Sequence, residues 1–390
     1  MKNVHLFSIG FRPFFLLAGV QAVFSIVAWG LMYAGVLKLS SVWENPVLWH
    51  GHEMVFGFAM AVIAGFLLTA AANWTGRAPL QSWPLAFLAG LWIAGRLCMA
   101  MSILTPMQTA IVDSLFIPAV ALSLAPMLIG AGKLKNMAFL VILSLFAVLN
   151  ILMHLSVLGV IELSAETLLF TAVHIIIFLI AVIGGRVLPF FTQNGMTQRG
   201  RALEVKVYPY VNELSLVLLL ATCIYGYLSA FNGAVFGVLA LLASAVHFAR
   251  LTQWQGHKTL SVPIVWILHL GYFWLVVGLF LEGLYALLGM GSFQAALHTL
   301  TIGAIGTMIL GMMTRVCLGH TGRPITSLKS MVLAYVLLQG AVISRLLGEM
   351  WLVTFYTESI LLSGILWATG FGLFILVYFP ILISKRPDGK

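Results

Sequence analysis

Apolar runs of about 20 residues recur along the whole 390-residue chain, and each can cross a hydrocarbon layer of about 30 Å as a helix. Inside a bilayer every backbone polar group needs an internal partner, which a helix supplies within a single segment. The sequence lacks the two-residue alternation of a membrane barrel. We therefore expect an all-α, polytopic membrane bundle, with residues 1–390 forming a single integral membrane domain.

About twelve transmembrane helices are predicted. The spans lie near residues 12–36, 50–72, 82–103, 106–129, 136–159, 166–188, 208–231, 233–251, 262–288, 293–317, 328–348 and 354–384. Only 8% of the residues are charged. A soluble domain carries roughly 25%, so this chain has too little polar material to cover a globular surface. The lipid bilayer is the expected surrounding of the protein.

The basic residues divide unevenly when successive loops are assigned to alternate sides of the membrane. Lys38, Arg96 and Arg345 fall on one side, and the other 17 of the 20 basic residues fall on the opposite side. These are Lys2, Arg12, Arg77, Lys133, Lys135, Arg186, Arg199, Arg201, Lys206, Arg250, Lys258, Arg315, Arg323, Lys329, Lys385, Arg386 and Lys390. By the positive-inside rule the second side is cytoplasmic, and both termini are expected there. The net charge of +9 is then a topology signal, and no nucleic-acid partner is expected.

Ten histidines are many for such an apolar chain, because ionisable side chains within a bilayer are costly and usually mark a pathway or a bound ligand. The predicted spans place five of them in one layer of the outer half of the membrane: His50, His52, His154, His174 and His298. His269 is expected deeper, and His247, His257 and His320 at the cytoplasmic edge. Imidazole is a favoured ligand of copper, iron and haem, so the layer predicts shared cofactor binding. The alternative is that each histidine forms a structural hydrogen bond between helices.

A repeat relates the second and tenth spans. His52 is followed 23 residues later by Thr75-Gly76-Arg77, and His298 is followed 23 residues later by Thr321-Gly322-Arg323. His174 lies 122 residues after His52 and 124 before His298, which would give three four-helix units, although the third copy keeps little besides its histidine. Repeats in membrane proteins commonly place a site at their mutual interface.

Four longer motifs carry a resemblance to a known family. They are Phe11-Arg12-Pro13-Phe14-Phe15, the segment from Trp49-His50-Gly51-His52-Glu53 to Asn73-Trp74-Thr75-Gly76-Arg77, Gly185-Arg186-Val187-Leu188-Pro189-Phe190-Phe191-Thr192, and Thr314-Arg315-Val316-Cys317-Leu318-Gly319-His320-Thr321-Gly322-Arg323-Pro324. Together they resemble the NnrS family over nearly the whole chain. The resemblance implies a bacterial cytoplasmic (inner) membrane protein that binds haem b and copper and is linked to nitric oxide, denitrification and nitrosative stress. It leaves open whether nitric oxide is bound, sensed or reduced. Electrons for reduction would come from a quinol or a periplasmic donor.

A second, more distant resemblance concerns the second span. His50-Gly51-x-x-Met54-x-Phe56 is similar to a motif of haem–copper oxidases and nitric oxide reductases, in which the histidine is an axial haem ligand. Those enzymes also have twelve helices in three arcs of four. This sequence has one histidine in the tenth span where the oxidases have two, and no His-His pair in the seventh. A complete oxygen-reducing binuclear centre is therefore not expected.

The candidate ligands follow from these patterns. For a haem with two histidine ligands, His298 is one expected ligand, and its partner is His50 by the oxidase-like motif or His52 by the repeat. Residues two apart on a helix point about 200° from each other, so His50 and His52 cannot serve one site in the same way. The candidate metal ligands are His50, His52, His154, His174, His269, His298 and His320.

Three further residues are candidates for supporting roles. Glu53, the candidate catalytic residue, could relay protons, accept a hydrogen bond from a ligand imidazole, or cap the second span. Arg12 and Arg96 are candidates for binding haem propionates, although snorkelling to lipid headgroups also explains Arg12. The competing function is a metal or small-molecule permease that uses intramembrane histidines as substrate ligands, without redox chemistry.

Overall fold

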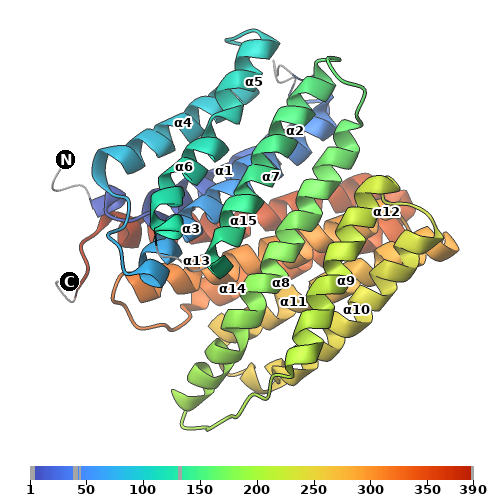
Figure 1. Cartoon of the computed structure of the whole chain (residues 1–390). Coiled ribbons are helices and arrows are strands. Elements are labelled where there is room, and N and C mark those ends of the chain that lie inside the picture. Colours follow the sequence, from blue (N-terminus) through green and yellow to red (C-terminus); the bar gives the residue numbers. More distant parts are fainter. Residues whose placement is uncertain (1–4, 38–42, 44, 131–133, 388–390) are drawn as a thin grey trace. The chain divides into compact units, whose positions relative to one another are not determined.

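The protein is entirely helical within the part of the chain that the computed structural model describes, which is all but residues 1–4, 38–42, 44, 131–133 and 388–390 (Figure 1). Twelve helical segments among these residues are long and apolar enough to cross a membrane. The predicted all-α multi-pass fold is confirmed. Of the basic residues used for the topology prediction, Lys2, Lys38, Lys133 and Lys390 lie outside the described residues.

The elements follow the chain in a simple order. They are η1 (His5–Phe7), α1 (Phe11–Tyr33), α2 (Pro46–His52), η2 (Glu53–Ala59), α3 (Met60–Thr75), α4 (Ser82–Ala100), α5 (Pro106–Ser114), α6 (Phe116–Ile129), α7 (Leu134–Val157), α8 (Ala165–Thr197), α9 (Pro209–Leu228), α10 (Ala234–Gln253), η3 (Gly256–Thr259), α11 (Pro263–Leu288), α12 (Phe293–His298), η4 (Thr299–Gly306), α13 (Thr307–His320), α14 (Lys329–Met350), η5 (Val353–Phe355) and α15 (Tyr356–Ile383). Several of these join into single spans: α2, η2 and α3 form one, α5 and α6 another, and α12, η4 and α13 a third.

The second span begins earlier than predicted. Its helix starts at Pro46 rather than His50, because the side chain of Asn45 caps it. The Asn45 Oδ1 accepts hydrogen bonds from the backbone N–H groups of Val47 at 2.9 Å and Leu48 at 3.2 Å. Proline at the first helical position needs no such partner. His50 therefore lies one turn inside the helix.

The sixth span ends later than predicted. α8 runs to Thr197 instead of residue 188, and Pro189 lies inside the helix without ending it. A helix of 33 residues is about 50 Å long, which exceeds a hydrocarbon layer of about 30 Å. The last turns of α8 therefore leave the apolar layer, so the hydrophobic pattern does not mark where the helix ends.

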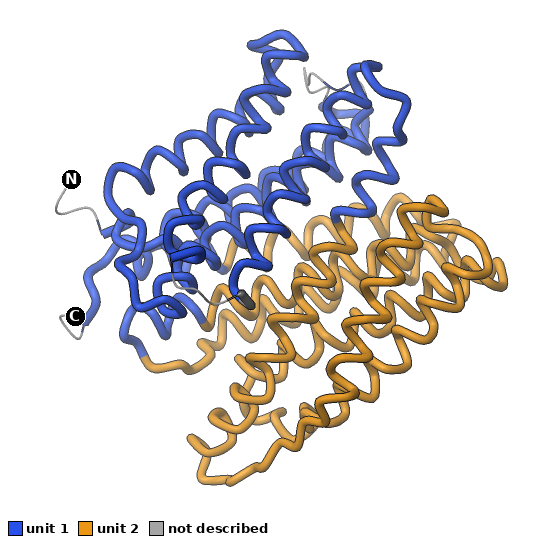
Figure 2. Tube along the Cα trace, in the orientation of Figure 1, with its two compact units in different colours: residues 1–172, 316–323, 374–390 blue, residues 173–315, 324–373 orange. Residues whose placement is uncertain are grey.

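The chain divides into two compact units (Figure 2). Unit 1 comprises residues 1–172, 316–323 and 374–390, and unit 2 comprises residues 173–315 and 324–373. Within unit 1, α3 packs on α1 and α6, and α6 also packs on α4 and α7. Within unit 2, α10 packs on α9 and α11, and α11 also packs on α12 and η4.

Close packing in unit 1 depends on small residues at the contact of α1 and α3. A Cβ atom on Gly65 would lie 2.8 Å from the Cβ of Phe14, and one on Gly10 would lie 2.5 Å from the Cβ of Leu68. Small residues let membrane helices approach closely where dispersion contacts replace the hydrophobic effect. The span that contains α3 is largely buried, and its first part carries the candidate site.

Candidate metal centre

Two spans contain a π-helix directly after a histidine. α2 ends at His52 and continues as η2, and α12 ends at His298 and continues as η4. Each then leads through an α-helix to a Thr-Gly-Arg turn whose glycine has a positive φ, 69° at Gly76 and 68° at Gly322. π-helical turns are rare and occur frequently at functional sites. The spacing repeat between these spans is thus matched by a shared local geometry, whereas His174 lies in the uninterrupted helix α8.

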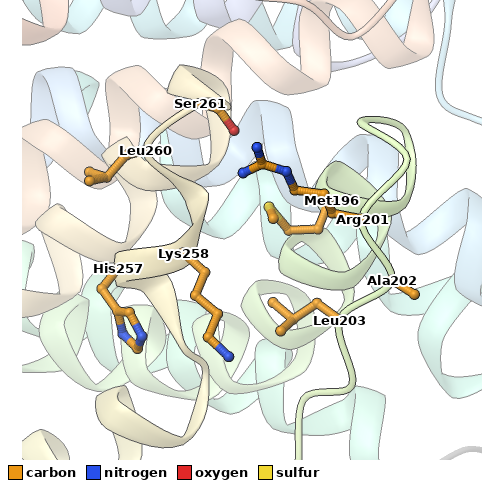
Figure 3. A pocket seen from close by; sticks show the side chains of 8 residues that line it. All are labelled: Met196, Arg201, Ala202, Leu203, His257, Lys258, Leu260 and Ser261. Carbon is orange, nitrogen blue, oxygen red and sulfur yellow. The ribbon is translucent and has the colours of Figure 1, made fainter.

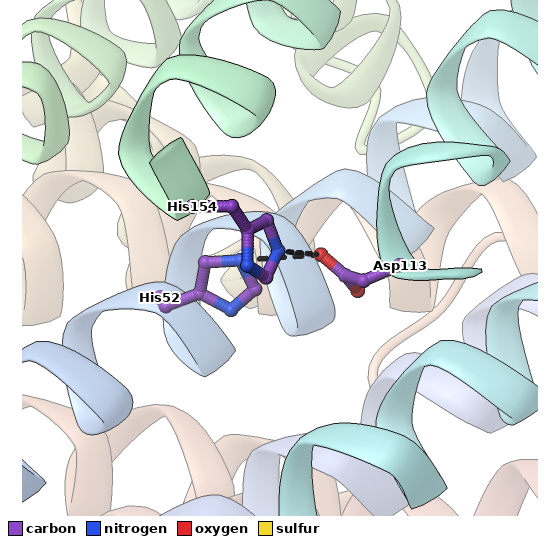
Figure 4. A group of neighbouring side chains, drawn as sticks. All are labelled: His52, Asp113 and His154. Atoms are coloured by element: carbon purple, nitrogen blue, oxygen red, sulfur yellow. Dashed lines mark hydrogen bonds and ion pairs between the residues drawn. The ribbon is translucent and has the colours of Figure 1, made fainter. Parts of the chain in front are cut away.

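His52, Asp113 and His154 form the candidate metal centre, within unit 1 (Figure 4). They come from α2, α5 and α7, and their exposed fractions are 0%, 3% and 2%. One ligand atom from each residue lies within 4.8 Å of the others. The Oδ2 atom of Asp113 lies 2.9 Å from Nε2 of His154 and 3.3 Å from Nε2 of His52. Two imidazole rings therefore face one carboxylate oxygen.

These distances fit a shared metal ion. Metal–nitrogen and metal–oxygen bonds of about 2.0–2.2 Å place neighbouring ligand atoms roughly 2.9–3.5 Å apart. Both Nε2–Oδ2 distances in the cluster fall within this range. Two imidazoles with one carboxylate suit copper, iron or zinc, whereas magnesium and calcium prefer sites made of oxygen ligands.

Glu53 supports His52 from the opposite side of the imidazole ring. Its Oε1 lies 3.2 Å from Nδ1 of His52, and a carboxylate can only accept, so Nδ1 carries a proton. A carboxylate behind a metal-binding histidine fixes the orientation of the ring. Since Asn45 caps the second span, the capping role considered for Glu53 is excluded. Its proton-relay role stays a prediction.

Arg96 joins the two carboxylates of the centre. Its guanidinium lies 2.5 Å from Glu53 Oε1 through Nη1 and forms an ion pair with Asp113 Oδ1 through Nη2. The amide of Gln21 donates to the second oxygen of Glu53 at 2.7 Å. Arg96 is thus engaged at the metal centre, while its predicted contact with a haem propionate stays a prediction.

The charges in these contacts do not balance. Glu53 and Asp113 bring two negative charges, and Arg96 brings one positive charge. His52 is also surrounded by acceptor oxygens, because Asn150 donates its amide N–H to Asp113 and so turns its oxygen toward Nε2 of His52, 2.9 Å away. Buried charge is costly unless it is paired. A proton on the ring would neutralise this excess negative charge, and a metal ion at Nε2 would more than offset it if it is divalent.

The sequence reasoning missed Asp113 and Asn150. Both are buried. Asp113 contacts the predicted residues His52, His154 and Arg96, and Asn150 contacts His52. A signal for Asp113 existed, since it is a lone acid within an apolar span, where ionisable side chains are rare and usually functional. Asn150 offers no comparable signal, because an amide within a span carries no charge.

The remaining predicted histidines lie elsewhere. His50 stacks on Trp29 with ring centres 4.9 Å apart, so it does not share the surroundings of His52. His298 Nδ1 lies 2.7 Å from the backbone oxygen of Gln294 and 3.5 Å from Glu349, in unit 2. Both neighbours accept, so Nδ1 carries the proton and the lone pair is on Nε2, which is the form of histidine that binds a metal.

His174 and His269 have separate surroundings within unit 2. His174 Nε2 lies 3.1 Å from Oε2 of Glu282, and both side chains are 0% exposed. His269 Nε2 lies 2.8 Å from the hydroxyl of Thr192. Glu282, like Asp113, is a lone acid in an apolar span that the sequence reasoning did not use.

His320 and Arg12 lie in unit 1 near the chain ends. The His320 ring packs against Phe11 with ring centres 5.7 Å apart. The Arg12 guanidinium donates to the backbone oxygens of Leu382 at 2.8 Å and Ser384 at 2.7 Å. Their predicted roles in binding metal and haem stay predictions.

Twelve apolar spans among the described residues, together with a buried histidine–carboxylate cluster in unit 1, define a multi-pass membrane protein with a candidate transition-metal centre. The sequence model described as NnrS protein matches residues 5–386, which is nearly the whole chain. The chain therefore belongs to the NnrS family. No match is found among curated proteins.

Proposed function

We propose that the protein binds copper at His52, Asp113 and His154, binds haem b through His298, and handles nitric oxide in the bacterial inner membrane. The buried His52–Asp113–His154 cluster is the observation that carries this proposal. Family membership supports the link to nitric oxide and metal binding. Nitric oxide is small and uncharged, so it can reach a buried site through the lipid.

Copper suits the donor set because imidazole nitrogen is a favoured copper ligand and carboxylate oxygen completes a mixed N,O site. A copper or iron ion with an open position would offer nitric oxide a place to bind. The residues of this chain would orient that ion: Glu53 holds His52 by its Nδ1–H, and Arg96 holds Asp113 by its other oxygen.

His298 is a suitable ligand for haem b because of the ring nitrogen that it offers. The backbone oxygen of Gln294 accepts from Nδ1, so Nε2 is the ring nitrogen that would hold the haem iron. Whether His50 or His52 would also bind haem stays a prediction. His52 is proposed here as a copper ligand, and one Nε2 atom cannot serve both a metal at Asp113 and a haem iron.

Absorption spectra of purified protein, oxidised and dithionite-reduced, test the proposal when metal analysis is done on the same sample. We expect reduced haem b bands that shift with nitric oxide, together with about one copper per chain. His298→Ala is expected to lose the haem bands and keep the copper. His154→Ala is expected to lose the copper and keep the haem bands.

The exposed His257→Ala variant is the matched control and is expected to retain both signals. A colourless and metal-free protein from cells grown with ample haem and copper would contradict the proposal. Metal-dependent flux across vesicles by that colourless protein would instead support the permease.

A further inference from the structure

A pocket of about 560 Å³ lies in unit 2 beside the end of α8 and the start of α11 (Figure 3). It is lined by Met196, Arg201, Ala202, Leu203, His257, Lys258, Leu260 and Ser261. The proposed nitric oxide chemistry uses none of these residues. The volume is that of a site for a small ligand or a lipid headgroup.

The pocket is cationic. Arg201 and Lys258 supply two basic side chains, and none of the eight lining residues is acidic. Clustered basic side chains attract phosphate, and Arg can bind it with two parallel N–H bonds. The expected ligand is therefore a phosphate-bearing anion.

Hydrogen bonds hold the two walls of the pocket together. Lys258 donates to the side-chain oxygen of Gln255 at 2.7 Å, and the Gln255 amide donates to the backbone oxygen of Glu204 at 2.9 Å. The backbone N–H of Tyr208 also donates to Gln253 at 3.1 Å. The segment after α8 is thus tied to the segment around η3, so the basic residues from both segments face one space.

Apolar side chains also line the pocket, and they come from both segments (Figure 3). Met196 at the end of α8 is 4% exposed, whereas Leu260 after η3 is 74% exposed. A leucine exposed to that extent is unfavourable in water but not against an acyl chain. Because α8 and α11 are both long and apolar enough to span a membrane, we expect the pocket between the end of one and the start of the other to lie near a membrane surface.

We propose that this pocket binds the phosphate headgroup of an anionic phospholipid, with Arg201 and Lys258 on the phosphate and Leu260 against the acyl chain. A soluble phosphate compound would use the same cations but would gain nothing from Leu260. The exposed Leu260, near the expected membrane surface, therefore favours a lipid over a soluble phosphate compound.

Native mass spectrometry of the detergent-solubilised full-length protein tests this with dioleoylphosphatidylglycerol, dioleoylphosphatidylcholine and sn-glycerol 3-phosphate. We expect the anionic lipid to bind most tightly. Each basic residue near an anionic headgroup contributes roughly fivefold in affinity, so the double variant R201Q/K258Q should bind it about 25-fold more weakly. Leu260→Ser should weaken lipid binding without changing the binding of glycerol phosphate.

The matched control is R199Q/K206Q, which removes two charges from the same connecting segment at residues that do not line the pocket. It should leave lipid binding within about twofold of the wild type, since the local pocket and not the total charge is responsible. Equal weakening by both double variants would overturn the proposal in favour of general surface attraction. Equally tight binding of glycerol phosphate would overturn it in favour of a soluble ligand.

Discussion

Asp113 is the residue on which the candidate metal centre depends most. It contacts His52, His154, Asn150 and Arg96, and with Glu53 it creates the excess negative charge. Removing this charge should make a bound cation unnecessary. The structure therefore links metal binding to the charge of one buried carboxylate.

Asp113→Asn is expected to abolish the stabilisation that copper gives. A ligand at 100 times its dissociation constant stabilises a folded protein by about 2.7 kcal/mol, which raises the unfolding temperature. The wild type should show this rise on adding copper to chelator-treated protein, and the variant should not. Without metal the variant should unfold no earlier than the wild type, because Glu53 and Arg96 then balance each other.

Glu166→Gln is the matched control for this experiment, since Glu166 is an exposed acid that accepts a hydrogen bond from the hydroxyl of Ser164 at 3.0 Å. It should keep the full response to copper. A copper response that survives in Asp113→Asn would mean that the ion binds elsewhere.

At the residue scale the sequence predicts some members of the candidate site. Depth within the spans predicts His52 and His154 as ligands, and Glu53 is predicted because it is a carboxylate next to that histidine layer. Their meeting point could not be predicted, because α2, α5 and α7 come together through helix packing that no local pattern encodes. The contact of His174 with Glu282 could not be predicted for the same reason, because it also depends on helix packing.

The π-helix η2 is the element that arranges the centre. Its Gly57 lies against two of the partners of Glu53: a Cβ atom there would lie 3.0 Å from Nη1 of Arg96 and 3.1 Å from Nε2 of Gln21. The backbone oxygen of Gly57 also accepts from the indole of Trp92 at 3.1 Å. A glycine at this position leaves room for the ion pair of Arg96 and Glu53.

Gly57→Ala is expected to destabilise the protein by about 1–3 kcal/mol, the usual cost of overpacking, and to weaken copper binding because Arg96 is displaced. Thermal unfolding and copper titration measure the two effects. Gly90→Ala on α4 is the matched control, because no atom lies within 4 Å of the added methyl group. Equal effects from the two changes would show that Gly57 has no special role.

Element positions were largely predictable from apolar runs, but their ends and internal turns were not. Helix α8 continues beyond the membrane layer, where hydrophobicity no longer reports on it. The π-helices η2 and η4 have no composition of their own, although the repeat around His52 and His298 identified the two spans that contain them.

For the whole molecule, the twelve candidate spans among the described residues predict that both termini lie on one side of the membrane, and the basic residues predict that this side is cytoplasmic. A green fluorescent protein fused to the C-terminus should therefore fluoresce, and alkaline phosphatase fused there should be inactive. Alkaline phosphatase inserted after Gly159, between α7 and α8, should be active. The opposite pattern would invert the topology and the predicted depth of every histidine.

We propose that His52, Asp113 and His154 together hold one transition-metal ion within the membrane. X-ray absorption at the copper edge, on copper-loaded wild type and on His154→Ala, tests it most directly. We expect nitrogen and oxygen neighbours of the metal at about 2.0–2.2 Å. The wild type should show scattering from two imidazole rings, and the variant should show scattering from one. Sulfur neighbours, or an identical spectrum in His154→Ala, would contradict it.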